Sequence, residues 1–234
     1  MRPTTVLFFN PDSARPLSRE LAALGAGAIL VPPATIVAPP DPLSWARTLS
    51  ELALFNWLVL PTAAAAEAVI EGIGAPPGLT IRVAAERAAG EVLRSEGRAP
   101  EVEASGLGDL LELLQGRIGR RQRALVPHAA VAGRRIGDRL QELGSEAVCR
   151  AAYDLRPVGA ISLDNPTAAI VAGGTEAETL ACWVQAGRIP NDLPVAALDP
   201  AAVDAAEDCG LVATLIPGLL GGGLLGPFLD ETLS

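Results

Sequence analysis

The sequence has few of the residue types that enzymes most often use for chemistry. Its 234 residues include no lysine, one histidine, one tyrosine and three cysteines, and aromatic residues make up only 3%. The cysteines lie far apart without CxxC spacing, which favours neither a disulfide framework nor a zinc site. No apolar run reaches the roughly 18 residues of a membrane span, and no signal segment is recognisable. We therefore expect a cytoplasmic protein without a bound metal.

The charge balance also excludes a class of partner. The net charge is −9, and all 18 basic residues are arginine. Nucleic-acid binding needs a surface that neutralises phosphates, so we expect no nucleic-acid partner. The local exception is the group Arg117, Arg120, Arg121 and Arg123. It is interpreted either as a solvated loop or as an anion-holding rim, and both interpretations stay open.

What the chain does have is a recurring unit: a short apolar run, a turn of small residues and an amphipathic helix. Four such turns are at residues 61–63, 127–129, 173–175 and 199–201. Alternating strands and helices predict parallel sheets covered by helices on both faces. Parallel sheets bind ligands at the carboxyl ends of their strands, so these turns are the expected ligand positions.

The apolar runs, caps and breakers predict the individual elements. We expect strands at residues 4–9, 28–31, 57–60, 80–83, 101–104, 124–126, 168–172, 195–198 and 212–216, and helices at 13–24, 45–54, 63–73, 86–95, 107–114, 134–143, 176–185 and 200–208.

Two extended, proline-marked segments interrupt this alternation. The expected fold class is therefore α/β, with two parallel-sheet α/β lobes joined by a two-stranded β-ladder. The first lobe is discontinuous in sequence. The expected ranges are 1–32 with 162–234 for lobe 1, 44–145 for lobe 2, and 33–43 with 146–161 for the connecting ladder.

Several segments together resemble the uroporphyrinogen-III synthase family. They are residues 22–32 (AALGAGAILVP), 55–68 (FNWLVLPTAAAAEA), 124–144, the tyrosine Tyr153 and residues 194–210 (PVAALDPAAVDAAEDCG). The resemblance implies a cofactor-free lyase of porphyrin and haem biosynthesis. Such an enzyme cyclises linear hydroxymethylbilane, a small tetrapyrrole, and inverts the last pyrrole ring. We expect a monomer.

The resemblance also implies site residues. Tyr153 would be catalytic and would assist loss of the substrate hydroxyl; the alternative is a strand tyrosine packed on the ladder. Backbone amides at helix starts would hold substrate carboxylates, whereas the alternative is simple capping by Thr62 and Thr175. The candidate substrate-binding residues are Asn10, Pro61, Thr62, Ala63, His128, Gly173, Gly174, Thr175 and Pro200.

Departures from the family pattern keep a second hypothesis open. Asn10 and His128 stand where the family has arginine, and Ala64 stands where it has asparagine. Asp199 at a strand end would repel an anionic substrate. The chain is therefore either a cyclase or a non-catalytic homologue that keeps the fold as a tetrapyrrole-binding or protein-partner module. The glycines at 221–223 lack the spacing of a dinucleotide-binding loop, so no cofactor is expected.

Overall fold

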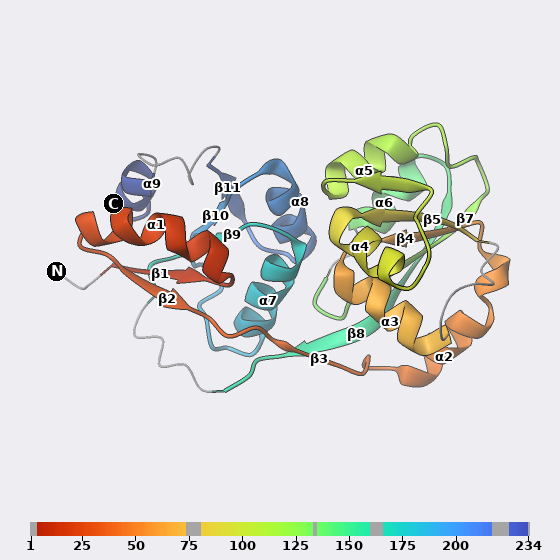
Figure 1. Cartoon of the computed structure of the whole chain (residues 1–234), viewed down its shortest axis with the longest axis horizontal. Coiled ribbons are helices and arrows are strands. Elements are labelled where there is room, and N and C mark those ends of the chain that lie inside the picture. Colours follow the sequence, from red (N-terminus) through yellow and green to blue (C-terminus); the bar gives the residue numbers. More distant parts are fainter. Residues whose placement is uncertain (1–3, 74–80, 133–134, 160–165, 217–224, 234) are drawn as a thin grey trace. The chain divides into compact units, whose positions relative to one another are not determined.

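The chain divides into two compact units, each with its own sheet (Figure 1). We call Met1–Thr35 with Arg156–Ser234 the discontinuous unit, and Ile36–Leu155 the continuous unit. The computed structural model describes residues 4–73, 81–132, 135–159, 166–216 and 225–233.

The discontinuous unit contains a five-stranded parallel sheet of order β11-β10-β9-β1-β2. Its strands are β1 (Thr5–Phe8), β2 (Gly27–Leu30), β9 (Ala168–Val171), β10 (Val195–Ala197) and β11 (Ala213–Leu215). Its helices are α1 (Pro11–Ala23), α7 (Gly174–Gln185), α8 (Pro200–Asp208) and α9 (Leu225–Leu233).

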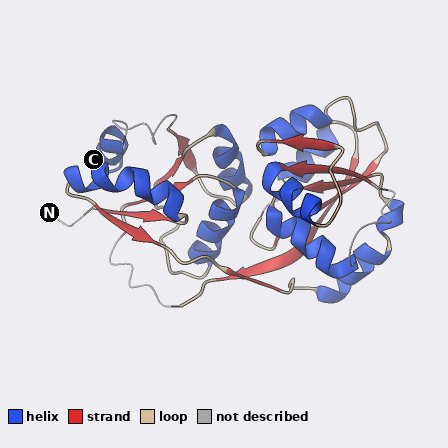
Figure 2. Cartoon of the chain, in the orientation of Figure 1, coloured by secondary structure: helices blue, strands red, loops and turns tan. Residues whose placement is uncertain are grey.

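Helices lie on both sides of this sheet (Figure 2), and strand alternation gives the sheet two apolar faces. Val6 and Phe8 of β1 face a cluster that includes residues of α1 and α9. Leu7 faces the opposite cluster, with Trp183 of α7 and residues of α8. Successive side chains of a strand point to opposite faces, so the three apolar residues of β1 after Thr5 contribute to both layers.

The continuous unit contains a six-stranded sheet of order β3-β8-β7-β4-β5-β6. Its strands are β3 (Thr35–Val37), β4 (Trp57–Leu60), β5 (Arg82–Glu86), β6 (Val102–Ala104), β7 (Arg123–Ala129) and β8 (Glu146–Arg156). Its helices are α2 (Pro42–Ser50), the short 3-10 helix η1 (Leu52–Leu54), α3 (Ala63–Ile73), α4 (Arg87–Ser95), α5 (Leu107–Leu114) and α6 (Arg135–Glu142).

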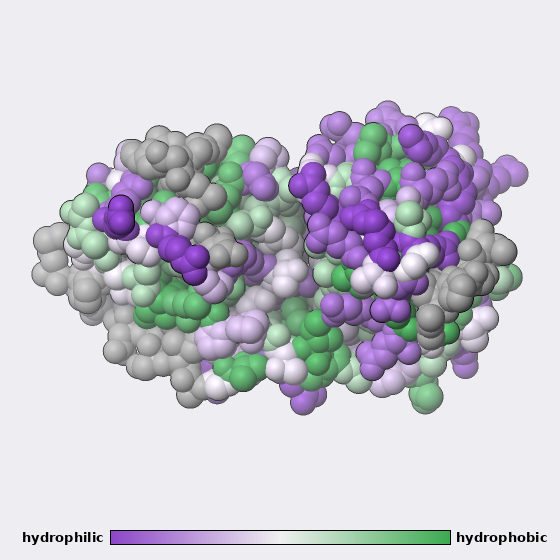
Figure 3. Space-filling view, in the orientation of Figure 1, coloured by the Kyte–Doolittle hydropathy of each residue, from purple (hydrophilic) through white to green (hydrophobic). Residues whose placement is uncertain are grey.

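The helices of the continuous unit lie on two faces of this sheet. Side chains of β4, β5, β6 and β7 form one buried cluster with α5 and α6. The helix α3 packs against α2 and α4 and contacts β4 and β7. Hydrophilic side chains gather on the outer surface around α4 and α5, where the Arg94–Glu103 ion pair lies (Figure 3).

The α/β class with parallel sheets, predicted from the sequence, is confirmed. Three helices have the predicted bounds: α3, α5 and α8. The predicted helix 45–54 is wrong at both ends, because Asp41 caps α2 one residue before Pro42 and a separate η1 follows. The predicted strand 80–83 is displaced, since β5 runs to Glu86.

Several regions of the sequence prediction fall partly or wholly outside the described residues. They include the glycines at 221–223, residue 80 of the predicted strand 80–83, residue 134 of the predicted helix 134–143, residues 160–161 of the second ladder segment and residues 162–165 of lobe 1. In the part of the chain that is described, no helix is both long and apolar enough to cross a bilayer.

Candidate functional site

Each sheet has a topological switch point, at which the order of successive strands changes direction across the sheet. In the discontinuous unit this point lies between β1 and β9, and in the continuous unit it lies between β4 and β7. Ligands of open α/β sheets bind just beyond the carboxyl ends of such strands. Nearly all the site residues expected from the sequence follow these strands or their neighbours, so each unit has its own set of candidate residues.

A β-bulge aims Tyr153 in the continuous unit. His128 of β7 pairs with Ala151, but the next residue, Ala129, pairs with Tyr153, so β8 contains one extra residue at Ala152. In regular pairing without a bulge, Ala152 would oppose Ala129 and the tyrosine ring would lie on the α5–α6 face of the sheet. The bulge turns the ring to the α3 face, which is how bulges re-aim side chains near functional sites.

On that face Tyr153 meets Thr62 at the start of α3. The phenol oxygen Oη lies 2.9 Å from Thr62 Oγ1, in a contact that joins positions 91 residues apart. The exposed fractions of the two residues are 1% and 6%. The same Oγ1 accepts a hydrogen bond from the backbone amide of Ala65 at 3.2 Å, so Thr62 caps α3. The predicted capping role of Thr62 is confirmed, and its hydroxyl serves two partners.

The neighbours of Thr62 complete the turn after β4. Pro61 and Ala63 are half-buried on either side of it, and Ala63 is the first residue of α3. Proline has no amide hydrogen to donate, so any anion held by this turn would depend on the amides that follow it.

His128 lies apart from this pair. Side chains alternate along β7, so His128 shares a face with Val126, which packs in the α5–α6 cluster. The ring nitrogen Nδ1 lies 2.7 Å from the carbonyl oxygen of Ala129. A carbonyl can only accept, so Nδ1 carries a hydrogen and Nε2 is the acceptor when the ring is neutral. The sheet therefore separates His128 from Tyr153, although the sequence analysis names both as candidate site residues.

The discontinuous unit contains a carboxylate that the sequence prediction missed. Glu176, in the first turn of α7, accepts a hydrogen bond from the backbone amide of Ala172 at 2.7 Å. The Asn10 side chain, which follows β1, also hydrogen-bonds this carboxylate. Burial raises the pKa of Glu176, and the negative charge of Asp199 raises it further. An internal carboxylate thus occupies Asn10, one of the candidate substrate-binding residues.

The remaining candidates of this unit lie around the same edge. Gly173 precedes α7 and Gly174 begins it, with no side chain capping the helix at Gly173. The expected cap by Thr175 is therefore wrong, because Thr175 is an exposed residue inside the first turn. Asp199 caps α8 through a 2.7 Å bond from the Ala202 amide, and Pro200 is exposed at the first position of that helix.

A second missed carboxylate ends β5 in the continuous unit. Glu86 caps α4 by accepting a hydrogen bond from the Ala88 amide at 2.9 Å. Burial raises the pKa of Glu86 against the opposing effect of this bond. The sequence signal was present, since a glutamate followed an apolar run, but the predicted strand ended three residues too early.

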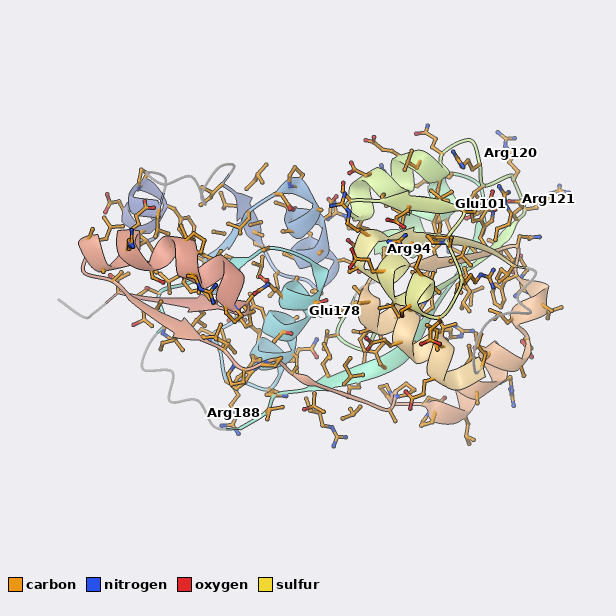
Figure 4. The ribbon with its side chains drawn as sticks, in the orientation of Figure 1. Arg94, Glu101, Arg120, Arg121, Glu178 and Arg188 are labelled. Carbon is orange, nitrogen blue, oxygen red and sulfur yellow. The ribbon has the colours of Figure 1, made fainter. Side chains whose placement is uncertain are left out.

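The arginine group lies away from the carboxyl edge of the sheet. Arg117, Arg120 and Arg121 belong to the loop between α5 and β7, which precedes β7 and so lies at its amino end. Figure 4 shows Arg120 and Arg121 projecting from this loop. Arg123 pairs with Glu146 and stacks over Phe55, 4.8 Å from the ring centre. The solvated-loop interpretation fits this position better than an anion-holding rim at the site.

Metal ligands do not gather in the described ranges. Across those ranges, no group of three or more His, Cys, Asp or Glu residues is placed to hold a metal ion.

Comparison with known proteins identifies the family. The family model for uroporphyrinogen-III synthase HemD matches residues 15–218. The chain belongs to the uroporphyrinogen-III synthase family. This membership supports a role in tetrapyrrole biosynthesis at a coarse level. No curated protein sequence matches the chain.

Solved structures of uroporphyrinogen-III synthases are similar to this chain at low sequence identity. A mutant uroporphyrinogen-III synthase from the extremely thermophilic bacterium Thermus thermophilus is 18% identical with a TM-score of 0.51, and the match covers 98% of each chain. A uroporphyrinogen-III synthetase from Helicobacter pylori is 12% identical with a TM-score of 0.45, again over 98% of each chain. The similarity to the Thermus structure establishes the two-lobe fold of the uroporphyrinogen-III synthases for this chain.

Proposed function

We propose that this chain cyclises linear hydroxymethylbilane to a tetrapyrrole ring with inversion of the last pyrrole. The family match supports the substrate class. The observation that carries the proposal is the Tyr153–Thr62 contact beyond the end of β4, at the topological switch point of the sheet. Two hydroxyl groups meet there in a part of the fold where ligands bind.

The chemistry requires little from the protein beyond one proton donor and a fixed geometry. The substrate loses the hydroxyl of its hydroxymethyl group as water, which leaves an electrophilic methylene carbon on the first pyrrole. The last pyrrole of the same molecule attacks this carbon. A phenol placed at the hydroxyl can donate the proton that leaves with the water. Because both reacting ends belong to one molecule, holding them in the correct orientation lowers much of the remaining barrier.

Tyr153 is nearly fully buried, so the proposal includes a local opening that brings substrate to its phenol. Motions of this kind are common where a reaction must exclude water. The proposal keeps the expectation of a cofactor-free, monomeric, cytoplasmic enzyme whose partner is a small tetrapyrrole rather than nucleic acid.

The test is an isomer assay on the purified protein and on Tyr153→Phe. Hydroxymethylbilane is added, and the ring-closed products are oxidised and separated by chromatography. We expect isomer III from the parent protein, and a rate lower by on the order of 100-fold for Tyr153→Phe, the lower end of typical general-acid effects. Formation of isomer I alone, at the rate of the spontaneous reaction, would contradict the proposal.

A second candidate function rests on the charges of the discontinuous unit. Glu176 occupies the Ala172 amide, and the exposed Asp199 lies at the end of the neighbouring strand. A polycarboxylate substrate would be repelled by both groups. The alternative is therefore a non-catalytic homologue that keeps the fold as a tetrapyrrole-binding or protein-partner module. It predicts isomer I from the parent protein and no difference between the parent and Tyr153→Phe.

A further inference from the structure

The hydroxyl of Thr62 has a defined hydrogen-bonding direction. Its oxygen Oγ1 has two partners within the described part of the chain, the Ala65 amide at 3.2 Å and Tyr153 Oη at 2.9 Å. An amide N–H can only donate, so Oγ1 accepts from Ala65. The hydroxyl hydrogen then needs an acceptor, and Tyr153 Oη is the one within reach.

The opposite direction leaves a buried donor unsatisfied. If Tyr153 donated to Thr62, Oγ1 would accept two hydrogen bonds and its own hydrogen would have no acceptor. Thr62 is only 6% exposed, so water would not readily take that role. An unsatisfied buried donor costs more free energy than a single hydrogen bond contributes. The arrangement in which Thr62 donates is therefore favoured.

We infer that Thr62 is a positioning residue for Tyr153 rather than a direct contact of the substrate. By donating to Oη, Thr62 directs the phenolic hydrogen away from itself. It also stabilises the negative charge that the oxygen gains as the proton leaves. The helix cap thereby sets the direction in which Tyr153 can give its proton. This role in the reaction rests on the proposed cyclase function, whereas the hydrogen-bond direction rests on geometry alone.

The single tyrosine of the chain allows a direct test. With tyrosine labelled at 13Cζ, the protein gives one tyrosine resonance, which reports the hydrogen bonding of the phenol oxygen. We expect Thr62→Val to move this resonance and Thr62→Ser to leave it close to that of the parent. Thr62→Ala removes the same hydroxyl and replaces Thr62→Val if the valine variant does not fold.

Loss of the helix cap needs its own control. Asp41→Ala removes an equivalent cap, the 2.9 Å bond from the Ser44 amide at the start of α2, in the same unit. If Thr62→Val and Asp41→Ala both lose stability but only Thr62→Val shifts the resonance, the capping role of Thr62 is separated from its contact with Tyr153. An unchanged resonance in Thr62→Val, or an equal shift in Asp41→Ala, would overturn the inference.

The isomer assay tests the catalytic half. Thr62→Val should slow formation of isomer III by about 10- to 100-fold, the range for a hydrogen bond to a charged group. Thr62→Ser should retain most of the rate. Thr62→Val combined with Tyr153→Phe should be no slower than Tyr153→Phe alone, because the two residues act as one unit. Multiplicative losses would overturn the positioning role. If the parent protein forms no isomer III, the cyclase proposal fails, and the resonance experiment still decides whether Thr62 holds Tyr153.

Discussion

Glu86 and Glu176 hold similar places in the two units, each at the start of a helix beyond the carboxyl end of a strand. Each accepts a hydrogen bond from a backbone amide, and burial raises the pKa of each. Backbone donors and burial act in opposite directions on a carboxylate, and here burial has the larger effect. Both carboxylates therefore take up protons more readily than an exposed glutamate does.

Replacement of Glu176 by glutamine should have an effect that depends on pH. The folded state binds the Glu176 proton more tightly than the unfolded chain, so the free energy of unfolding falls as pH rises through and beyond the ordinary pKa of 4.5. Glutamine does not titrate, and its oxygen can still accept from the Ala172 amide. The difference in the free energy of unfolding between Glu176→Gln and the parent is measured by urea unfolding at neutral and at acidic pH. We expect this difference to favour the variant more at neutral pH than at acidic pH. Glu67→Gln, at an exposed position on α3, is the control. Equal differences at both pH values would count against this account.

At the scale of elements, α6 packs closely against β8. A Cβ atom built on Gly137 of α6 would overlap Cys149 Sγ of β8, far closer than such atoms approach. Cys149 packs against the buried cluster of the α5–α6 face, to which Ile136 and Leu140 of α6 belong. Glycine is unfavourable within a helix, so close packing is the reason for glycine here.

Gly137→Ala should therefore lower stability despite the better helix propensity of alanine. Overpacking of a well-packed core costs roughly 1–3 kcal/mol, against a gain of about 1 kcal/mol from propensity. Gly226→Ala in α9 is the matched control, since its nearest neighbour would be Leu24 Cδ2 at 3.6 Å. Urea midpoints should fall for Gly137→Ala and hold or rise for Gly226→Ala. Adding Cys149→Ala should recover part of the loss in the first variant.

At the scale of the whole molecule, the sequence predicts the features that depend on nearby residues, such as the bounds of helices. The bounds of α3, α5 and α8 were predicted because each helix begins after a turn or cap that is visible in the sequence. The bulge at Ala152 could not be predicted, since it depends on how β8 pairs with β7. The bond from Ala172 to Glu176 could not be predicted either, because it depends on where the first turn of α7 lies. Of the candidate residues, Tyr153 and Thr62 meet, and His128 lies on the other face.

The continuous unit should fold by itself. Ile36–Leu155 is one uninterrupted stretch with its own sheet and buried cluster. A fragment of residues 36–155 should unfold cooperatively in urea and show dispersed amide resonances. A fragment of residues 36–144 lacks β8. It should not unfold cooperatively, because β7 would lose one of its two neighbouring strands. A gradual, non-cooperative transition of the longer fragment would show that the two units depend on each other for stability.

The packing of Gly137 over Cys149 also links the reactivity of this thiol to the position of α6. Cys149 is half-buried and its sulfur lies against α6, so movement of α6 off the strand would expose the sulfur further to a thiol reagent. Such local openings occur in folded proteins with free energies below that of global unfolding. The labelling rate of Cys149 therefore depends on how α6 packs on β8, besides the exposure that the residue has in the folded protein.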